Sequence, residues 1–187
     1  MAKDIQPGWQ APPLNAHSKV VQTLHDLYTP ESFLGFLVAA GYSQGVNGQP
    51  DYGVDRGAFG ERLGAAAIRD SSQDLFTGAV FAPMLHQDPR YYIEGDGYSA
   101  AHRTLYAVTR SLITRRDDGK QTLNTSLLLG YAAAAALTNA YYPQSERTAK
   151  DSARTYGASI GGAALGFVFH EFIGDALEVA HLRKQRQ

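Results

Sequence analysis

The chain has 187 residues, a length typical of one domain. Ala and Gly together make up about a quarter of it, and charged residues only 19%, against roughly 25% in an average domain. A hydrophobic fraction of 44% excludes a disordered chain, and a net charge of −1 gives no basic excess for binding nucleic acid. The absence of Cys excludes a disulfide framework, a thiolate metal site and a Cys nucleophile.

Residues 1–16 form a polar, Pro-rich N-terminal segment without the apolar stretch of a signal peptide. Residues 17–187 are predicted to form a single helical domain, because alternating β-branched runs are missing and Ala favours helix. We therefore expect an all-α bundle of six to seven helices, with close-packed faces rich in Gly and Ala.

Two helices are expected before residue 46, over 17–28 and from 30 to about 45. In the first, four apolar residues share one side at helical spacing: Val20, Val21, Leu24 and Leu27. The second begins with a capping hydroxyl, a proline in the first turn and an acidic residue near the positive helix end: Thr29, Pro30 and Glu31.

Further helices are predicted after a loop over 46–56. The expected helices cover 57–70, 73–82, 99–116, 124–142 and 145–183. Ser71-Ser72 interrupts the first pair, and the last is either one helix or two with a break near Gly174. Pro83 and Pro89 make 83–98 irregular or a single helical turn, Asp117–Lys120 is a turn, and Pro143 stops a helix.

Four stretches contain no Asp, Glu, Lys or Arg: 32–50, 75–87, 121–145 and 155–170. We expect none of them to span a bilayer alone, because a span needs about 20 strongly apolar residues. Small residues at G-x-x-x-G spacing instead indicate close helix contact: Gly60 and Gly64, Gly157 and Gly161, and Gly162 and Gly166. Packing inside a soluble bundle, a self-association seam and a membrane hairpin all remain open.

The densest chemical stretch is His86-Gln87-Asp88-Pro89-Arg90-Tyr91-Tyr92. His titrates near neutral pH, Asp can orient it, and Arg can hold an anion. Five residues are therefore candidates for a catalytic cluster: His86, Asp88, Arg90, His102 and Glu171. The structural alternative is that Asp88 caps a turn, Arg90 pairs with a carboxylate and His86 packs.

A structural belt of ion pairs is expected between the helices near 99–116 and 145–183. Glu171 follows an uncharged run, so it is predicted to be partly buried and to need a partner, either Arg103 or Arg90. The belt would comprise Arg90, Arg103, Arg110, Glu171 and Asp175. No metal site and no cofactor are predicted, and nucleophile-elbow, zinc-protease, P-loop and dinucleotide-binding motifs are absent from the sequence.

The order of these motifs resembles a family of exported bacterial proteins, of the Acidobacteria type, to which no activity is assigned. The resemblance covers most of 17–175 and is strongest in the string His86–Tyr92. It implies a location in the cell envelope or periplasm.

Two main functions follow as hypotheses. The first is a non-enzymatic helical envelope protein that contacts lipid or self-assembles through its Gly/Ala-rich helices. The second is a small hydrolase or metal-dependent enzyme that uses the candidate cluster. A soluble ligand-binding bundle is a third.

Overall fold

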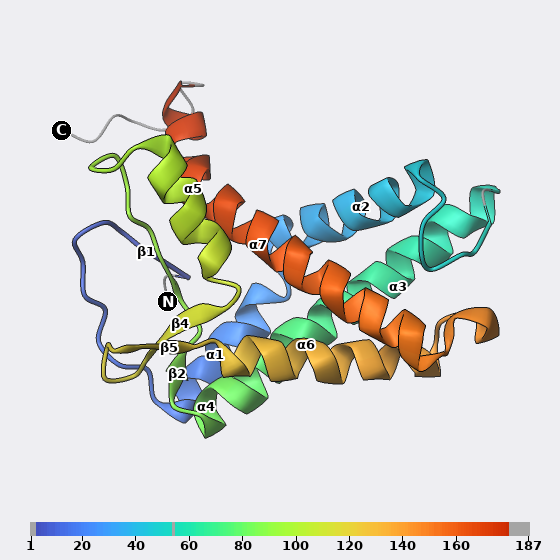
Figure 1. Cartoon of the computed structure of the whole chain (residues 1–187), viewed down its shortest axis with the longest axis horizontal. Helices are drawn as coiled ribbons and strands as arrows, with labels where there is room; N and C mark the ends of the chain where they lie inside the picture. Colours follow the sequence, from blue (N-terminus) through green and yellow to red (C-terminus); the bar gives the residue numbers. More distant parts are fainter. Residues whose placement is uncertain (1–2, 54, 180–187) are drawn as a thin grey trace.

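The longest helix, α7 (Ala149–Val179), runs diagonally across the molecule, and both α5 (Ala100–Thr109) and α6 (Thr125–Leu137) pack against it (Figure 1). The structure is a computed structural model that describes residues 3–53 and 55–179. Helices account for 66% of it, which confirms the predicted, mostly helical fold class. The alternative break near Gly174 is absent, so α7 is one continuous helix.

Helices α1 (Ala16–Asp26) and α2 (Pro30–Gly45) begin within a residue of where the sequence predicts. The Asn15 side chain accepts a hydrogen bond from the Ser18 amide, and the Thr29 side chain accepts one from the Ser32 amide. Each cap satisfies a backbone N–H that has no partner within the first turn.

Helix α1 turns its polar side inward. Lys19, Gln22 and Thr23 are buried, whereas Val21 and Leu24 are 47% and 46% exposed. The Lys19 ammonium donates to both carboxylate oxygens of Asp117, at 2.7 and 2.8 Å, and so ties α1 to the distant turn at 117–120. Of the four apolar residues predicted to share one side, Val20 and Leu27 are half-buried and the other two are exposed, so this stripe is not the most buried face of α1.

Helices α2 and α3 (Arg56–Asp74) form a hairpin that is closed by one buried arginine. The Arg62 guanidinium donates to five oxygen acceptors, none of them a carboxylate: the Ser43 hydroxyl, the Asn47 side chain and the carbonyls of Gly48, Pro50 and Gly53. The loop over 46–53 therefore wraps around a cation whose N–H groups replace water for the loop carbonyls.

No break occurs at Ser71-Ser72, contrary to prediction. Instead α3 continues into a π-helical segment, η1 (Leu75–Phe81), and then a last turn, α4 (Ala82–Met84). Ser72 is tolerated within the helix because its hydroxyl donates to the Arg69 carbonyl at 2.8 Å. The wider π segment packs against both α1 and α6, so this irregular stretch lies at the centre of the helix contacts.

Five short strands correct the expectation that strands are absent. β1 (Asp4–Ile5) pairs in parallel with β3 (Tyr91–Tyr92), and β4 (Ile113–Arg116) lies between β2 (Gln87–Asp88) and β5 (Gln121–Leu123) in an antiparallel sheet. The predicted turn at 117–120 connects β4 to β5. Segments of two to four residues are too short for the period-2 pattern by which strands are recognised in a sequence.

The strands shorten two predicted elements. The helix expected over 99–116 ends at Thr109, because its last residues join the sheet. The N-terminal segment adds β1 to the fold, and Ile5 within it is buried. Short 3₁₀ turns, η2 (Thr138–Ala140) and η3 (Gln144–Glu146), link α6 to α7 around Pro143.

The predicted glycine stripes do not mediate packing within the described chain. A Cβ added at any of six glycines would have no neighbour within 4 Å: Gly60, Gly64, Gly157, Gly161, Gly162 and Gly166. Close helix approach occurs instead at Gly130 of α6, which lies against the backbone of Thr77 in η1. Gly78 similarly lies against Thr23 of α1.

We predict that Gly130→Ala destabilises the fold whereas Gly161→Ala does not. The new Cβ at residue 130 would lie 2.7 Å from the Thr77 nitrogen and 2.9 Å from its Cα, so backbone must shift, at a cost of about 1–3 kcal/mol. Gly161→Ala meets open space and should stabilise α7 by about 0.5–1 kcal/mol. Thermal unfolding of both variants measures the difference, and equal melting temperatures would contradict the packing described.

Candidate functional site

The carboxylate of Glu171, on α7, is buried within a complete set of hydrogen-bond donors. It accepts from the Tyr91 hydroxyl at 2.7 Å, from the Glu94 and Gly95 amides at 3.2 and 3.1 Å, and from Arg103 Nε at 2.8 Å. Burial and the hydrogen bond to Glu171 both raise the pKa of Tyr91 above its ordinary value. Four donors to one carboxylate compensate for the loss of water on burial.

Arg103, on α5, connects this carboxylate to a second one on the next turn of α7. Its guanidinium donates to Asp175 Oδ2 at 2.7 Å and to the Glu171 carbonyl at 2.8 Å, and it lies over the Phe172 ring at 4.5 Å. Burial lowers the pKa of Arg103, but Asp175 and Glu171 outweigh it and raise the pKa overall. Arg103, Glu171 and Asp175 thus form the ion-pair group expected between α5 and α7.

A second ion pair, between Asp88 and Arg90, lies apart from the first. Arg90 donates to Asp88 through Nε at 2.8 Å, Nη2 at 2.7 Å and its own amide at 3.0 Å, and the Tyr92 hydroxyl donates at 2.8 Å. Arg90 Nη2 also donates to the Pro12 carbonyl. Burial raises the pKa of Asp88, but these hydrogen bonds outweigh it and hold the pKa below its usual range.

The two ion pairs are joined by strand β3. Successive side chains of a strand point to opposite faces. Accordingly the Tyr91 hydroxyl reaches Glu171 while the Tyr92 hydroxyl reaches Asp88. The most distinctive string in the sequence therefore braces two buried carboxylates.

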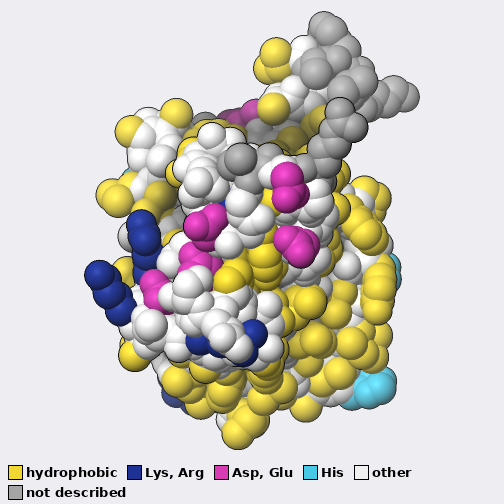
Figure 2. Space-filling view, turned by 90° about the vertical axis from the view of Figure 1, so that its right-hand side faces the viewer, with side chains coloured by type: hydrophobic (Ala, Val, Ile, Leu, Met, Phe, Trp, Pro, Cys, Tyr) yellow, Lys and Arg dark blue, Asp and Glu magenta, His cyan; other side chains and the backbone are white. Residues whose placement is uncertain are grey.

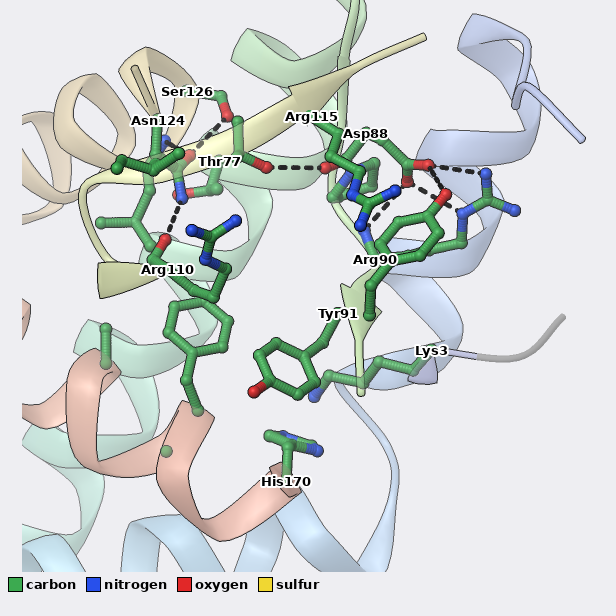
Figure 3. A pocket seen from close by; sticks show the side chains of 18 of the residues that line it. Lys3, Thr77, Asp88, Arg90, Tyr91, Arg110, Arg115, Asn124, Ser126 and His170 are labelled. Carbon is green, nitrogen blue, oxygen red and sulfur yellow. Dashed lines mark hydrogen bonds and ion pairs between the residues drawn. The ribbon is translucent and has the colours of Figure 1, made fainter. Parts of the chain in front are cut away.

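Beside the Asp88–Arg90 pair and strand β3 lies a cavity of about 210 Å³ with polar and aromatic walls (Figure 3). Arg110, at the end of α5, lies over the Tyr106 ring at 4.3 Å, and Arg115 of β4 lies over the Tyr92 ring at 4.2 Å. Figure 3 shows the Arg110 and Arg115 side chains on one side of this space and Tyr91 and His170 on the other. Helix α7 contributes His170 and three apolar or small residues to the lining: Ala163, Gly166 and Phe167.

His170 is held between two carboxylates from distant parts of the chain. Its Nδ1 lies 3.1 Å from Asp4 Oδ2, and its Nε2 lies 3.1 Å from Glu31 Oε1. The residues belong to β1, α2 and α7, so only the tertiary structure brings them together. No short motif in the sequence indicates this group, and the same is true of Arg115 opposite Asp88 in the sheet.

The five candidate catalytic residues do not converge. The His86 side chain is 77% exposed, and its Nδ1 is 3.9 Å from Asp117 rather than facing Asp88. The His102 side chain is 53% exposed and stacks on Tyr98, and its Nε2 lies 3.0 Å from Glu94 Oε2. The carboxylates of Asp88 and Glu171 are saturated by hydrogen bonds within the chain, so neither has a free position from which to act as a base.

Two members of the predicted belt do not join it. Arg90 pairs with Asp88 rather than Glu171, and Arg110 has no ion-pair partner within 3–53 and 55–179. The reason is local: Asp88 is two residues from Arg90, and Arg110 is held against Tyr106 by stacking. In the part of the chain that the structure describes, no group of three or more His, Asp or Glu could hold a metal ion.

We predict that Asp88→Ala lowers the free energy of unfolding by about 3–5 kcal/mol, because it leaves Arg90 buried without its carboxylate. The pKa of Asp88 is lower in the folded protein than in the unfolded chain. Its contribution to the free energy of unfolding is therefore complete above the unfolded-state pKa, and it is lost as the pH falls through the folded-state pKa. Wild-type stability should therefore fall below about pH 4 more steeply than that of the variant. Chemical denaturation between pH 2 and 7 measures the free energy of unfolding of both proteins. Asp118→Ala, in the exposed turn, is the control. Parallel plots of unfolding free energy against pH for Asp88→Ala and wild type would contradict the assignment.

Comparisons with known proteins add no family to this geometry. No protein-family model, curated protein or solved structure matches the chain.

Proposed function

We propose that the chain is a non-enzymatic, membrane-embedded helical protein of the cell envelope. The observation that carries this proposal is the distribution of side chains, which is inverted relative to a water-soluble domain. Of the 12 buried hydrophobic residues in the described chain, 8 are Ala, whereas 17 polar or charged residues are buried. In the same part of the chain, 25 large hydrophobic side chains are exposed.

This inversion is the pattern that a bilayer favours. Lipid tails solvate large apolar side chains, so these can face outward, while small residues let helices approach and ionisable groups pair in the interior. Figure 2 shows a broad apolar surface on one side of the molecule, with charged side chains grouped apart from it.

Helices α2 and α7 carry much of this apolar surface. α2 exposes five large apolar or aromatic residues: Phe33, Leu34, Leu37, Val38 and Tyr42. Within the described residues, α7 is long and apolar enough to cross a membrane by length and composition, and only 11% of its apolar window is buried. α7 extends beyond the uncharged stretch 155–170 at both ends, which gives it the length that this stretch lacks by itself. The open face over Gly157 and Gly161 leaves room for acyl chains or for a second copy.

The enzyme hypothesis receives less support, because its candidate residues are dispersed or saturated. Self-assembly through the same apolar faces is the competing outcome, since a second copy could also cover them. Membrane embedding and self-assembly are distinguished by whether lipid or a second copy of the chain contacts α7.

We predict that Leu165→Glu weakens binding to lipid vesicles by about 100-fold, because a carboxylate within the apolar layer costs about 2.5–3.5 kcal/mol. Leu165 is 72% exposed on α7. Leu105 is 66% exposed on α5, which is not one of the two helices, α2 and α7, that carry most of the proposed lipid-facing surface, so Leu105→Glu is the matched control. Vesicle flotation measures binding, and circular dichroism verifies that both variants fold. Equal flotation of the two variants would contradict the proposal.

The chain contains no Cys, so single-cysteine labelling resolves lipid from a second copy. A fluorophore on Leu165→Cys should be quenched by brominated lipid, and one on Leu105→Cys should not. Disulfide crosslinking between copies through Leu165→Cys without lipid quenching would favour self-assembly instead. A 20.3 kDa monomer without detergent by light scattering, together with absent flotation, would overturn both alternatives.

A further inference from the structure

The cavity beside β3 contains two arginines that lack an anionic partner in the described chain. Arg110 Nε and Nη1 and Arg115 Nε are buried atoms that make no hydrogen bond there. The one side-chain hydrogen bond from Arg110 is a long one, 3.3 Å, from Nη2 to the Thr109 hydroxyl. A buried guanidinium N–H group without a hydrogen bond is energetically unfavourable. An acceptor from outside the chain would supply the hydrogen bonds that these N–H groups lack.

The arginines are fixed in place without using these N–H groups. Each guanidinium stacks on a tyrosine ring, Arg110 on Tyr106 and Arg115 on Tyr92. Both guanidinium groups border the same cavity, as does Tyr106. Burial raises the pKa of the Tyr106 hydroxyl, and the positive charges of Arg110 and Arg115 oppose that rise. Stacked, preorganised guanidinium groups lose little conformational freedom on binding an oxyanion.

The charge of the cavity wall selects the sign and the class of the ligand. Its cations are Lys3, Arg90, Arg110 and Arg115, whereas its carboxylates are Asp74 and Asp88. Asp88 is already neutralised by Arg90. His170 is engaged by Asp4 and Glu31, so it adds no free cation. The wall therefore retains an excess of positive charge that a dianion matches better than a monocarboxylate.

We propose that this cavity binds a phosphate group through Arg110 and Arg115. Guanidinium groups match the oxygens of phosphate in geometry and charge. The volume of about 210 Å³ is below the roughly 300–1,000 Å³ of sites for drug-sized ligands, so the site suits a small group such as phosphate. The phosphate can be free in solution or be the headgroup of a lipid. The site follows from the cavity geometry alone and does not depend on the membrane location proposed above.

The test is calorimetric titration of the full chain, in mild detergent, with inorganic phosphate at constant ionic strength. We expect one saturable site, with affinity reduced at least about 10-fold by Arg110→Gln and by Arg115→Gln, because each substitution removes a charge-assisted hydrogen bond. Arg116→Gln is the matched control, since Arg116 is the next residue of β4 and is exposed. Its affinity should stay within about 2-fold of wild type, because a surface charge contributes little.

A parallel titration with water-soluble dihexanoyl phosphatidic acid distinguishes the two sources of phosphate. Arginine-dependent binding of inorganic phosphate identifies free phosphate as a ligand, whereas arginine-dependent binding of the lipid alone identifies a headgroup. Binding of neither, or binding that both arginine variants retain, would overturn the proposal.

A second measurement needs only the wild-type chain and so does not depend on the folding of a variant. Phenylglyoxal modifies arginine, and mass spectrometry of the digested protein reports each site separately. Whichever phosphate compound binds in the titrations should slow modification of Arg110 and Arg115 several-fold but leave Arg116 unchanged. Equal modification rates with and without that compound would contradict the site.

Discussion

The buried carboxylate of Glu171 joins parts of the chain that are far apart in sequence. Arg103 reaches it from α5, Tyr91 from β3, and the Glu94 and Gly95 amides from the loop that follows. Removing Arg103 would leave the carboxylate charge unpaired in the interior, and removing one of the neutral donors would leave a carboxylate oxygen short of a hydrogen bond, so one group fixes the geometry of α5, β3 and α7. The cavity depends on this arrangement, because β3 and α7 form two of its walls.

Buried polar contacts are a recurring principle in this fold. Lys19 binds Asp117, Arg62 binds the carbonyls of the loop over 46–53, and Arg90 binds Asp88. Their counterpart is the apolar exterior of α2 and α7. In water this arrangement would reduce the hydrophobic contribution to folding, because many apolar side chains stay exposed. In a bilayer the outward apolar side chains are solvated by lipid. The same inversion explains why α1 buries its polar side although its apolar stripe is regular.

The cavity and the apolar exterior lie on different parts of the molecule. The cavity is built from the strands, the end of α5, parts of η1 and α6 and one side of α7, whereas the exterior belongs to α2 and the exposed face of α7. A phosphate site beside a membrane-embedded body would place the ligand where an anionic group can meet stacked arginines. The membrane location and the phosphate site rest on different observations, the first on side-chain burial and the second on N–H groups without hydrogen bonds. An experiment that contradicts one of them therefore leaves the other in place.

The sequence by itself determined the helical class, the starts of α1 and α2, the turn at 117–120 and a partner for Glu171. Helix capping, proline geometry and the cost of a buried charge are local or nearly local effects, so they can be recognised in the sequence. Only the tertiary structure decided which face of each helix turned inward. It placed Gly130 rather than Gly161 at the close contact, separated Arg90 from Glu171, and brought Asp4, Glu31 and His170 together. Those outcomes depend on contacts between residues distant in sequence, and periodicity and spacing carry no information about which elements become neighbours.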